Sequence, residues 1–538
     1  MRSLTTLFCA LLSTGSVFAI QGQEGSVGPD VAVSGVAGDG QVDVEASPVI
    51  GGIRSFAMGS TSCNVGTEKV DWIAGNGHQH PCIAQNLFRI HDGRIEQLGY
   101  SFLKHSFFAL STPGCTALPC QGTNGSELGV GCADTYGAYL NDGNFGGSKR
   151  DIVATTGFHN SNTPPVGGNS VHRGRLQVLE SELVTPGAHY IAEIQYQTEE
   201  DQLAGLARNN ASWRELFFTF GAGSPPFGGP IRRYDPAIYA WADIDPLVNI
   251  TEVPNLDEGG TGVHGWFFVG SRAELVGTNE WRYTYAVQNF TSEQSARSFQ
   301  IHNPCGATIT DPYFRDVEAH SGDPWSPVDW SFSTTGGMIR WETESFAQNV
   351  DANAIRWGTL YTFGFTADMP PGDSLADMDM FKPGTANLLS TNVTGPCGTL
   401  LCTAAKYCTS NLHSGGSRAE ISMLGSVSVS DNDMVLHVFG AVQGEPALFY
   451  YGTSQVEQPF GNGVRCVGGS TFRVNPPIVT GLFGDGSITV DFGTAPFSSP
   501  GAGQVLPGVS HNYQVWFRDP GDPNGFNLSD GLYVAYCP

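Results

Sequence analysis

The sequence has little charge, and most of that charge is acidic. Lys and Arg together number 26 against 51 Asp and Glu, charged residues make up 14% of the chain, and the formal net charge is −25. Nucleic acid and anionic membrane surfaces require a basic binding face, so neither is an expected partner. Aromatic residues reach 11%, which argues against a disordered chain.

Several motifs of catalysis are also missing. We find no Gly-x-Ser-x-Gly elbow, no His-Glu-x-x-His, no Walker loop and no Cys-x-x-Cys pair. These absences argue against serine hydrolases on α/β folds, zincin proteases, nucleotide enzymes and zinc ribbons. No apolar run after residue 19 is long enough to span a bilayer, so we expect no transmembrane segment.

The first 19 residues have the pattern of a secretory signal peptide. One arginine precedes an apolar run that ends in Val17-Phe18-Ala19, which predicts cleavage after Ala19. The chain has 12 cysteines, and removal of Cys9 leaves an odd number that should form disulfides after export. Short-range pairs are plausible, namely Cys63–Cys82, Cys120–Cys132 and Cys397–Cys402.

The chain is rich in glycine, proline and short runs in which apolar and polar residues alternate. It has 70 Gly and 32 Pro, and in WRYTYAVQN the side chains of Trp281, Tyr283, Tyr285 and Val287 share one face. This pattern predicts an all-β fold of two or three β-sandwich domains in series, immunoglobulin-like or jelly-roll-like, stapled by disulfides and with very little helix. One short helix is expected after Thr198, where Asp201 completes a capping pattern.

Composition shifts suggest the domain boundaries. We expect a signal peptide at 1–19, a flexible lead-in at 20–48, an N-terminal β-rich domain at 49–222, an immunoglobulin-like sandwich at 229–386, a linker at 387–406 and a C-terminal sandwich at 407–538. The breaker-rich segment from Gly221 to Pro230 separates the first two domains.

A well-specified hairpin lies in the N-terminal domain. Asp92-Gly93 is a two-residue loop that suits a type I′ turn. Pairing outward from it predicts three cross-strand pairs, His91 with Arg94, Ile90 with Ile95 and Arg89 with Glu96. Because side chains alternate, one face of the ribbon should be buried and the other, with His91, should be exposed to solvent.

Histidines gather near this hairpin and suggest a metal site. In GHQHP an extended backbone places His78 and His80 on one face, and His105 lies between Leu103 and Phe107. Two or three imidazoles with an open position suit Cu or Zn, which would activate water or dioxygen. The plainer interpretation is structural, because Gly77 and Pro81 place the pair in a loop and histidines among aromatics usually belong to a core.

Three other patterns leave alternatives open. The carboxylates Glu180, Glu182 and Glu193, or Asp316, Glu318 and Asp323, would suit a glycosidase if two flanked a sugar bond. Asp-rich turns at 243–260, 430–433 and 527–531 would suit Ca. Aromatic side chains could stack on sugars or form core, namely Trp281, Trp325, Trp330 and Trp357.

The last block carries a resemblance. YCTSN from Tyr407, ALFYYGTSQVEQPFGNGVRCVGG from Ala447 to Gly469, QVWFRDP, FNLSDGL and the final YCP resemble a C-terminal domain of exported proteins of planctomycete-type bacteria. The resemblance covers about a quarter of the chain and implies export and a β-sandwich but no particular reaction. The chain lacks the second cysteine that this domain carries shortly after Cys408, so the resemblance does not indicate which cysteine pairs with Cys408.

These observations together predict an exported extracellular or cell-surface protein of binding or structural type. The expected partners are extracellular glycans or other surface proteins. The alternative is a secreted metalloenzyme that holds Cu or Zn through His78, His80 and His105 and acts on polysaccharide.

Overall fold

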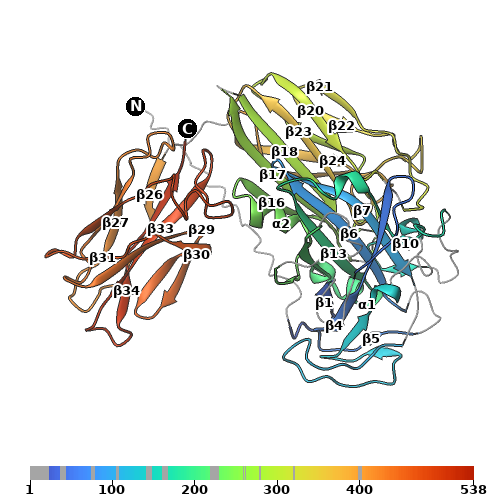
Figure 1. The fold of residues 1–538 in the computed structure, drawn as a ribbon, viewed down its shortest axis with the longest axis horizontal. Helices are drawn as coiled ribbons and strands as arrows, with labels where there is room; N and C mark the ends of the chain where they lie inside the picture. Colours follow the sequence, from blue (N-terminus) through green and yellow to red (C-terminus); the bar gives the residue numbers. More distant parts are fainter. Residues whose placement is uncertain are drawn as a thin grey trace, which may run out of the picture.

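The chain is all-β, as its sequence predicts (Figure 1). The computed structural model describes residues 24–36, 44–73, 79–104, 108–140, 148–159, 168–218, 229–258, 260, 262–277, 280–318, 321–397 and 403–537. Helix in these ranges is limited to α1 (Glu199–Ala204), α2 (Ile238–Ile244) and the 3-10 turns η1 (Ala138–Leu140), η2 (Lys149–Asp151), η3 (Glu180–Glu182) and η4 (Ala207–Asn209). Thr198 caps α1 as predicted, because its Oγ1 accepts a hydrogen bond from the Asp201 N–H at 3.3 Å. No described helix is long and apolar enough to cross a membrane.

The N-terminal half is built around a five-stranded antiparallel sheet. Its strands, in spatial order, are β15 (Arg232–Arg233), β14 (Ala211–Leu216), β13 (His189–Gln197), β6 (Cys82–His91) and β7 (Arg94–Lys104). Two small sheets cover one face, formed by β1 (Val31–Val36), β4 (Ser60–Asn64) and β9 (Ala133–Tyr136), and by β12 (Leu176–Leu179), β3 (Ile53–Met58) and β2 (Val44–Ala46). Two-stranded ribbons complete this half, β5 (Val70–Asp71) with β8 (Glu127–Leu128) and β10 (Ile152–Val153) with β11 (Phe158–His159).

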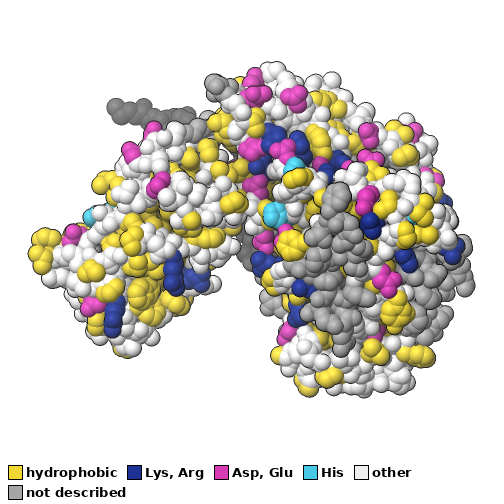
Figure 2. All heavy atoms as spheres, viewed as in Figure 1, with side chains coloured by type: hydrophobic (Ala, Val, Ile, Leu, Met, Phe, Trp, Pro, Cys, Tyr) yellow, Lys and Arg dark blue, Asp and Glu magenta, His cyan; other side chains and the backbone are white. Residues whose placement is uncertain are grey.

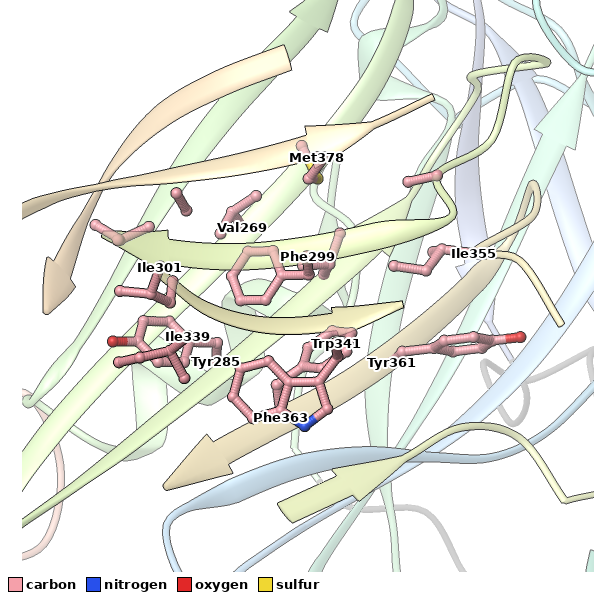
Figure 3. Close-up of a cluster of buried hydrophobic side chains, with 14 of the residues drawn as sticks. Val269, Tyr285, Phe299, Ile301, Ile339, Trp341, Ile355, Tyr361, Phe363 and Met378 are labelled. Atoms are coloured by element: carbon pink, nitrogen blue, oxygen red, sulfur yellow. The ribbon is translucent and has the colours of Figure 1, made fainter. Parts of the chain in front are cut away.

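Two further five-stranded antiparallel sheets form the middle of the chain. The first contains β16 (Val248–Asn255), β17 (Gly265–Gly277), β18 (Glu280–Asn289), β23 (Thr359–Ala367) and β20 (Ile309–Arg315). The second contains β21 (Ser331–Thr335), β22 (Met338–Glu342), β19 (Ser298–His302), β24 (Gly372–Asp379) and β25 (Leu388–Gly395). Aromatic side chains such as Tyr285, Phe299, Trp341 and Phe363 fill the space between them (Figure 3). This is a β-sandwich with an aromatic core.

The N-terminal sheet and the middle sandwich also share a core. Side chains alternate along β13, so Tyr190 and Ile194 point to the core under the two small sheets while Ile191 points the other way. Ile191 packs in a cluster that includes Trp241 of α2 and Phe268 of β17. Both faces of the centre of this sheet are therefore buried, and β6 and β13 show long runs of buried residues.

The C-terminal sandwich forms a lobe of its own, in orange and red in Figure 1, and Leu247 from the preceding part of the chain packs against its core. Its large sheet contains β26 (Thr403–Tyr407), β35 (Gly531–Ala535), β33 (Ser510–Arg518), β29 (Pro446–Phe460) and β30 (Gly463–Arg473), with β31 (Ile478–Val479) beside β29 and β34 (Phe526–Leu528) beside β33. The small sheet contains β27 (Glu420–Leu424), β28 (Val435–Phe439) and β32 (Gly486–Thr489). A separate hydrophobic core joins the two sheets.

The hairpin of β6 and β7 has the predicted register. His91 pairs with Arg94, Ile90 with Ile95 and Arg89 with Glu96. Asp92 and Gly93 have φ of 49° and 69°, as a type I′ turn requires. His91 is exposed as predicted. The prediction that Glu96 is exposed to solvent is wrong. Glu96 is 6% exposed, and its carboxylate accepts hydrogen bonds from Arg89 and from the Tyr313 hydroxyl of β20.

The described disulfides confirm one predicted pair and correct two. They are Cys63–Cys115, Cys120–Cys132, Cys305–Cys397 and Cys408–Cys466, and Cys537 is also disulfide-bonded. The predicted partners of Cys63 and Cys397 are wrong because the fold brings together cysteines 52 and 92 residues apart. Cys82 instead lies in the core on β6, with its Sγ 3.1 Å from Nδ1 of His159.

Two predicted connecting segments are wrong in part. Residues 31–36, assigned to a flexible lead-in, form β1, whose six residues are all buried against β4 and the central sheet. The predicted linker at 387–406 contains β25, which extends the middle sandwich, and the start of β26, which pairs with β35. The other domain boundaries stay predictions.

Glu258, which follows β16, is a buried carboxyl with a perturbed pKa. It is 3% exposed, and its Oε1 accepts hydrogen bonds from the Gln294 N–H and, at 3.0 Å, from the Ser292 hydroxyl. Burial raises its pKa from 4.5 to about 7. The folded protein therefore holds this proton more tightly than the unfolded chain does.

This pKa predicts a pH dependence of stability. Since the folded-state pKa is raised, the contribution of Glu258 to stability is fully present below pH 4.5 and is lost as the pH rises towards 7. Over that interval the free energy of unfolding should fall by roughly 3 kcal/mol more for the wild type than for Glu258→Gln, in which all other groups still titrate. Denaturant unfolding of both proteins at several pH values measures the difference. Parallel pH profiles would contradict the prediction.

Candidate functional site

Of the three histidines in the predicted metal site, only His80 lies in the described part of the chain. His78 and His105 lie outside the described residues, whereas His80 is 3% exposed with its ring 5.4 Å from that of Trp72. Its Nδ1 lies 3.1 Å from the carbonyl oxygen of Pro81. His80 lines a hollow of about 310 Å³ with Asp71, Gln79, Thr198, Glu199, Glu200 and Leu203. Among the described residues no three His, Cys, Asp or Glu side chains come together to hold a metal, so the Cu or Zn site stays a prediction.

The predicted carboxylate groups have structural partners. Glu180 pairs with Arg54 at 2.6 Å, and Glu182 pairs with Arg315 at 2.7 Å. Glu193 is 0% exposed, so no sugar can reach it in the folded protein. In the second group Asp316 accepts a hydrogen bond from Asn353 in the core and Asp323 accepts one from Ser148, while Glu318 is exposed.

The four tryptophans suggested as sugar platforms belong to the core. Their exposed fractions are 3% for Trp281, 6% for Trp325, 5% for Trp330 and 4% for Trp357. Strand alternation correctly placed Trp281 on one face of β18, but that face points inward between the sheets of the middle sandwich. Stacking of a ligand on these rings is excluded.

The Asp-rich turns also have partners of their own. Asp245 accepts hydrogen bonds from the Leu247 N–H at 2.9 Å and from Arg272 at 2.6 Å. In the other two turns Asp433 accepts one from the Ser426 N–H and Asp530 accepts one from the Ile421 N–H. These contacts are ordinary turn and loop chemistry, and Ca at these turns stays a prediction.

An open groove lies on the outer face of the large C-terminal sheet. Along β29 and β33 the residues Phe449, Tyr451, Val515 and Phe517 point into the core. The intervening residues therefore emerge on the opposite face. There Leu448, Tyr450 and Trp516 line a groove of about 470 Å³, together with Phe460, Arg465, Thr471, Phe472, Arg473 and Leu528.

Aromatic rings form a nearly continuous surface along this groove. Trp516 and Phe526 are stacked, with ring centroids 6.0 Å apart and planes inclined by 28°. Phe460 lies 5.2 Å from Phe526 and is 48% exposed. Trp516 pairs across the sheet with Leu448 of β29, so an apolar row runs across the strands.

Two arginines of β30 border the aromatic surface. Arg473 pairs across the sheet with Tyr450, and Arg465 is close enough to Tyr450 to oppose the rise in its pKa that burial causes. The Arg465 Nε donates to the Val467 carbonyl at 2.7 Å. In the described part of the chain no ion pair joins either guanidinium to a carboxylate. Figure 2 shows basic side chains among hydrophobic ones over β30 and β34.

The floor of the groove is fixed by buried polar contacts. Gln514 of β33 donates to the carbonyls of Val464 at 2.8 Å and Ser529 at 2.7 Å, and its Oε1 accepts from the Tyr450 hydroxyl and, at 2.9 Å, from the Cys466 N–H. These bonds tie three strands to one side chain. The Cys408–Cys466 disulfide adds a covalent link.

The turn between β29 and β30 needs glycine at Gly461. This residue has φ of 62°, and a Cβ there would lie 2.7 Å from the ring of Phe526. Glycine therefore permits both the left-handed backbone and the close approach of the turn to the aromatic surface. The GNG sequence that contains Gly461 is typical of a turn, but nothing in it indicates the ring beside it.

Sequence reasoning identified these strands and missed the groove. ALFYYG and QVWFRD alternate clearly, yet alternation does not say which face is covered by another sheet. The available signal was that both faces of these strands carry large side chains. A strand with one wet face usually places polar residues there.

The comparisons with known proteins assign the chain to no family. No family model matches the sequence, and no curated protein matches it. Similar solved structures include the Actinomyces fimbrial adhesin FimA, with 10% identity over 54% of this chain and 97% of that chain at a TM-score of 0.13. A tetra-tandem repeat from the extending region of a large adhesion protein has 7% identity over 92% of this chain and 99% of that chain at 0.15. TM-scores this low support no inference about function.

Proposed function

We propose that the protein is an exported extracellular binding protein and that its C-terminal β-sandwich binds acidic polysaccharide in the groove. The observation that carries the proposal is the surface of Tyr450, Trp516 and Phe526 beside Arg465 and Arg473. The disulfides support an oxidising compartment, as the signal-peptide pattern also does.

The shape and chemistry of the groove favour a sugar polymer. Half-buried aromatic rings offer flat apolar faces on which the C–H faces of sugar rings can pack, and Tyr450 adds a hydroxyl. The groove is open and runs over a sheet surface, whereas sites for small ligands enclose most of the ligand. A polymer that crosses the strands would contact the whole aromatic row.

The two arginines favour an acidic sugar. A guanidinium presents a planar fork of N–H donors that matches a carboxylate or sulfate in a bidentate arrangement. The whole chain carries a net charge of −25, so most of its surface repels a polyanion. A local basic edge on such a protein would confine an acidic polymer to the groove.

A survey of polysaccharides tests the proposal. The purified full chain is run through native gels that contain polygalacturonate, heparin or neutral hydroxyethylcellulose. We expect retardation in at least one acidic gel and none in the neutral gel. Equal mobility in all gels, or retardation by the neutral polymer alone, would contradict the proposal.

Substitution of the arginines should weaken binding to the acidic polymer. Arg473→Gln and Arg465→Gln each remove one charge-assisted contact, which is worth about 1.5 kcal/mol or more, so each should raise the Kd about tenfold. Affinity electrophoresis over a range of polymer concentrations gives these constants. The control is Arg418→Gln, which removes an exposed arginine outside the groove lining. Equal losses in all three variants would point to a general charge effect.

A further inference from the structure

Two buried carboxyls from distant parts of the chain meet beside β1. Asp30 directly precedes β1, and Asp201 lies in α1; both are 0% exposed. The Asp201 Oδ2 accepts a hydrogen bond from the N–H of Val31 at 3.1 Å, which places its carboxylate next to Asp30. The backbone of Asp30 is held in turn, because its carbonyl accepts from the Val65 N–H at 2.9 Å.

Each carboxyl has one oxygen with a partner and one without. Asp30 Oδ1 accepts from the Asn209 amide at 3.0 Å and the Ser26 side chain also lowers the pKa of Asp30, whereas Asp30 Oδ2 and Asp201 Oδ1 make no well-formed hydrogen bond. Asn210 is also 0% exposed and lies beside Asp201, where its amide lowers the pKa of that carboxyl. Neither amide atom of Asn210 makes a well-formed hydrogen bond. Asp30, Asp201 and Asn210 thus each have one side-chain oxygen that makes no well-formed hydrogen bond.

The charges of the two carboxyls are not compensated by the described protein. No described ion pair reaches Asp30 or Asp201. Burial raises the pKa of both groups, and the charge of Asp30 raises that of Asp201 further. An arrangement of this kind needs either a bound cation or a retained proton, since two carboxylates cannot remain charged side by side in a dry interior.

We propose that Asp30, Asp201 and Asn210 bind one hard divalent cation of the calcium class. Calcium takes oxygen ligands only, from carboxylates, amide oxygens and main-chain carbonyls, and two carboxylates neutralise its charge. The three side chains come from the segment before β1, from α1 and from the residue after η4. The cation therefore ties the N-terminal strand to the turn that follows β13 and stabilises the N-terminal core.

Metal content and thermal unfolding test the site. The full chain is dialysed against EGTA and then unfolded by heat with EGTA, with calcium or with magnesium in the buffer. We expect calcium to raise the Tm by roughly 5 °C or more, and magnesium to raise it less. A Tm that is equal in calcium and in EGTA, with no calcium retained in elemental analysis, would overturn the proposal.

Matched variants distinguish a cation bound at this site from a cation bound elsewhere and from a proton shared by the two carboxyls. Asp201→Asn and Asp30→Asn should each abolish the calcium-dependent shift and lower the bound calcium by one ion per chain. Asp373→Asn removes an exposed carboxylate from β24, outside the Asp-rich turns, and should leave both readouts unchanged. A shared proton, or a bridging water, would instead make Asp201→Asn as stable as the wild type or more stable, with no effect of calcium on either protein. That outcome would overturn the proposal.

Discussion

Trp516→Ala should raise the Kd for an acidic polysaccharide by about 30-fold or more. Tryptophan side chains at the centre of a binding surface contribute about 2 kcal/mol or more to the free energy of binding, which corresponds to that factor. Trp516 lies between Leu448 and Leu528 and stacks on Phe526, so it occupies the middle of the groove. Its removal would also loosen Phe526. Isothermal titration with the polysaccharide retained in the gels measures the loss.

The control for this variant is Phe483→Ala. Phe483 belongs to the same sandwich and is 74% exposed, but it is not part of the groove. We expect its removal to change the Kd less than twofold, within the usual effect of a surface substitution. Circular dichroism establishes that both variants keep their β structure. If Trp516→Ala binds as well as the wild type, the groove is not the binding site.

Glu193→Ala should destabilise the protein by about 3–5 kcal/mol, because it leaves several buried N–H donors without an acceptor. The carboxylate of Glu193 lies between the central sheet and the middle sandwich and is 0% exposed. It accepts hydrogen bonds from Asn86 at 2.7 Å, from the Ala237 N–H at 2.5 Å and from Gln288 at 3.1 and 3.3 Å. Alanine would leave all three donors buried without an acceptor.

The neutral variant gives a sharper test. Both oxygens of Glu193 face N–H donors, so Glu193→Gln directs an NH₂ group at another donor and should cost about 1–3 kcal/mol. Glu280→Ala, at an exposed strand end, should change the free energy of unfolding by less than about 0.5 kcal/mol. Denaturant unfolding gives all three values. A Glu193→Ala protein as stable as Glu280→Ala would show that the network does not hold the two layers together.

Local chemistry could be predicted from the sequence. The Asp92-Gly93 turn set the register of β6 and β7, and Thr198 marked the start of α1, because each depends on a few adjacent residues. The all-β class followed from alternation and turn spacing. Cys120–Cys132 could be predicted because only 12 residues separate its cysteines.

Features that depend on distant partners could not be predicted. VAVSGV at 31–36 has weak alternation because β1 is buried on both faces, so it looked like a lead-in. The longer disulfides and the acidic pair of Asp30 and Asp201 join segments from 52 to 171 residues apart in sequence (201 − 30 = 171). The resemblance of the last block stays a prediction.

The groove could not be predicted from the sequence for the same reason. Trp281 and Trp516 occur in similar alternating strands, yet Trp281 is 3% exposed between two sheets, whereas Trp516 lies on an outer face. Only the placement of a second sheet decides which face stays open. The histidine pattern around His80 remains a prediction for the same reason, because its proposed partners lie outside the described residues.

Footprinting of the aromatic side chains is the most direct test of sugar binding in the groove. Hydroxyl radicals oxidise accessible rings, and mass spectrometry compares the full chain with and without the polysaccharide retained in the gels. We predict protection of Trp516, Phe526 and Phe460, with unchanged oxidation of Phe439 and Phe483, which are 56% and 74% exposed elsewhere on the sandwich. Unchanged oxidation of Trp516 at saturating polysaccharide would contradict the assignment of the groove as the binding site.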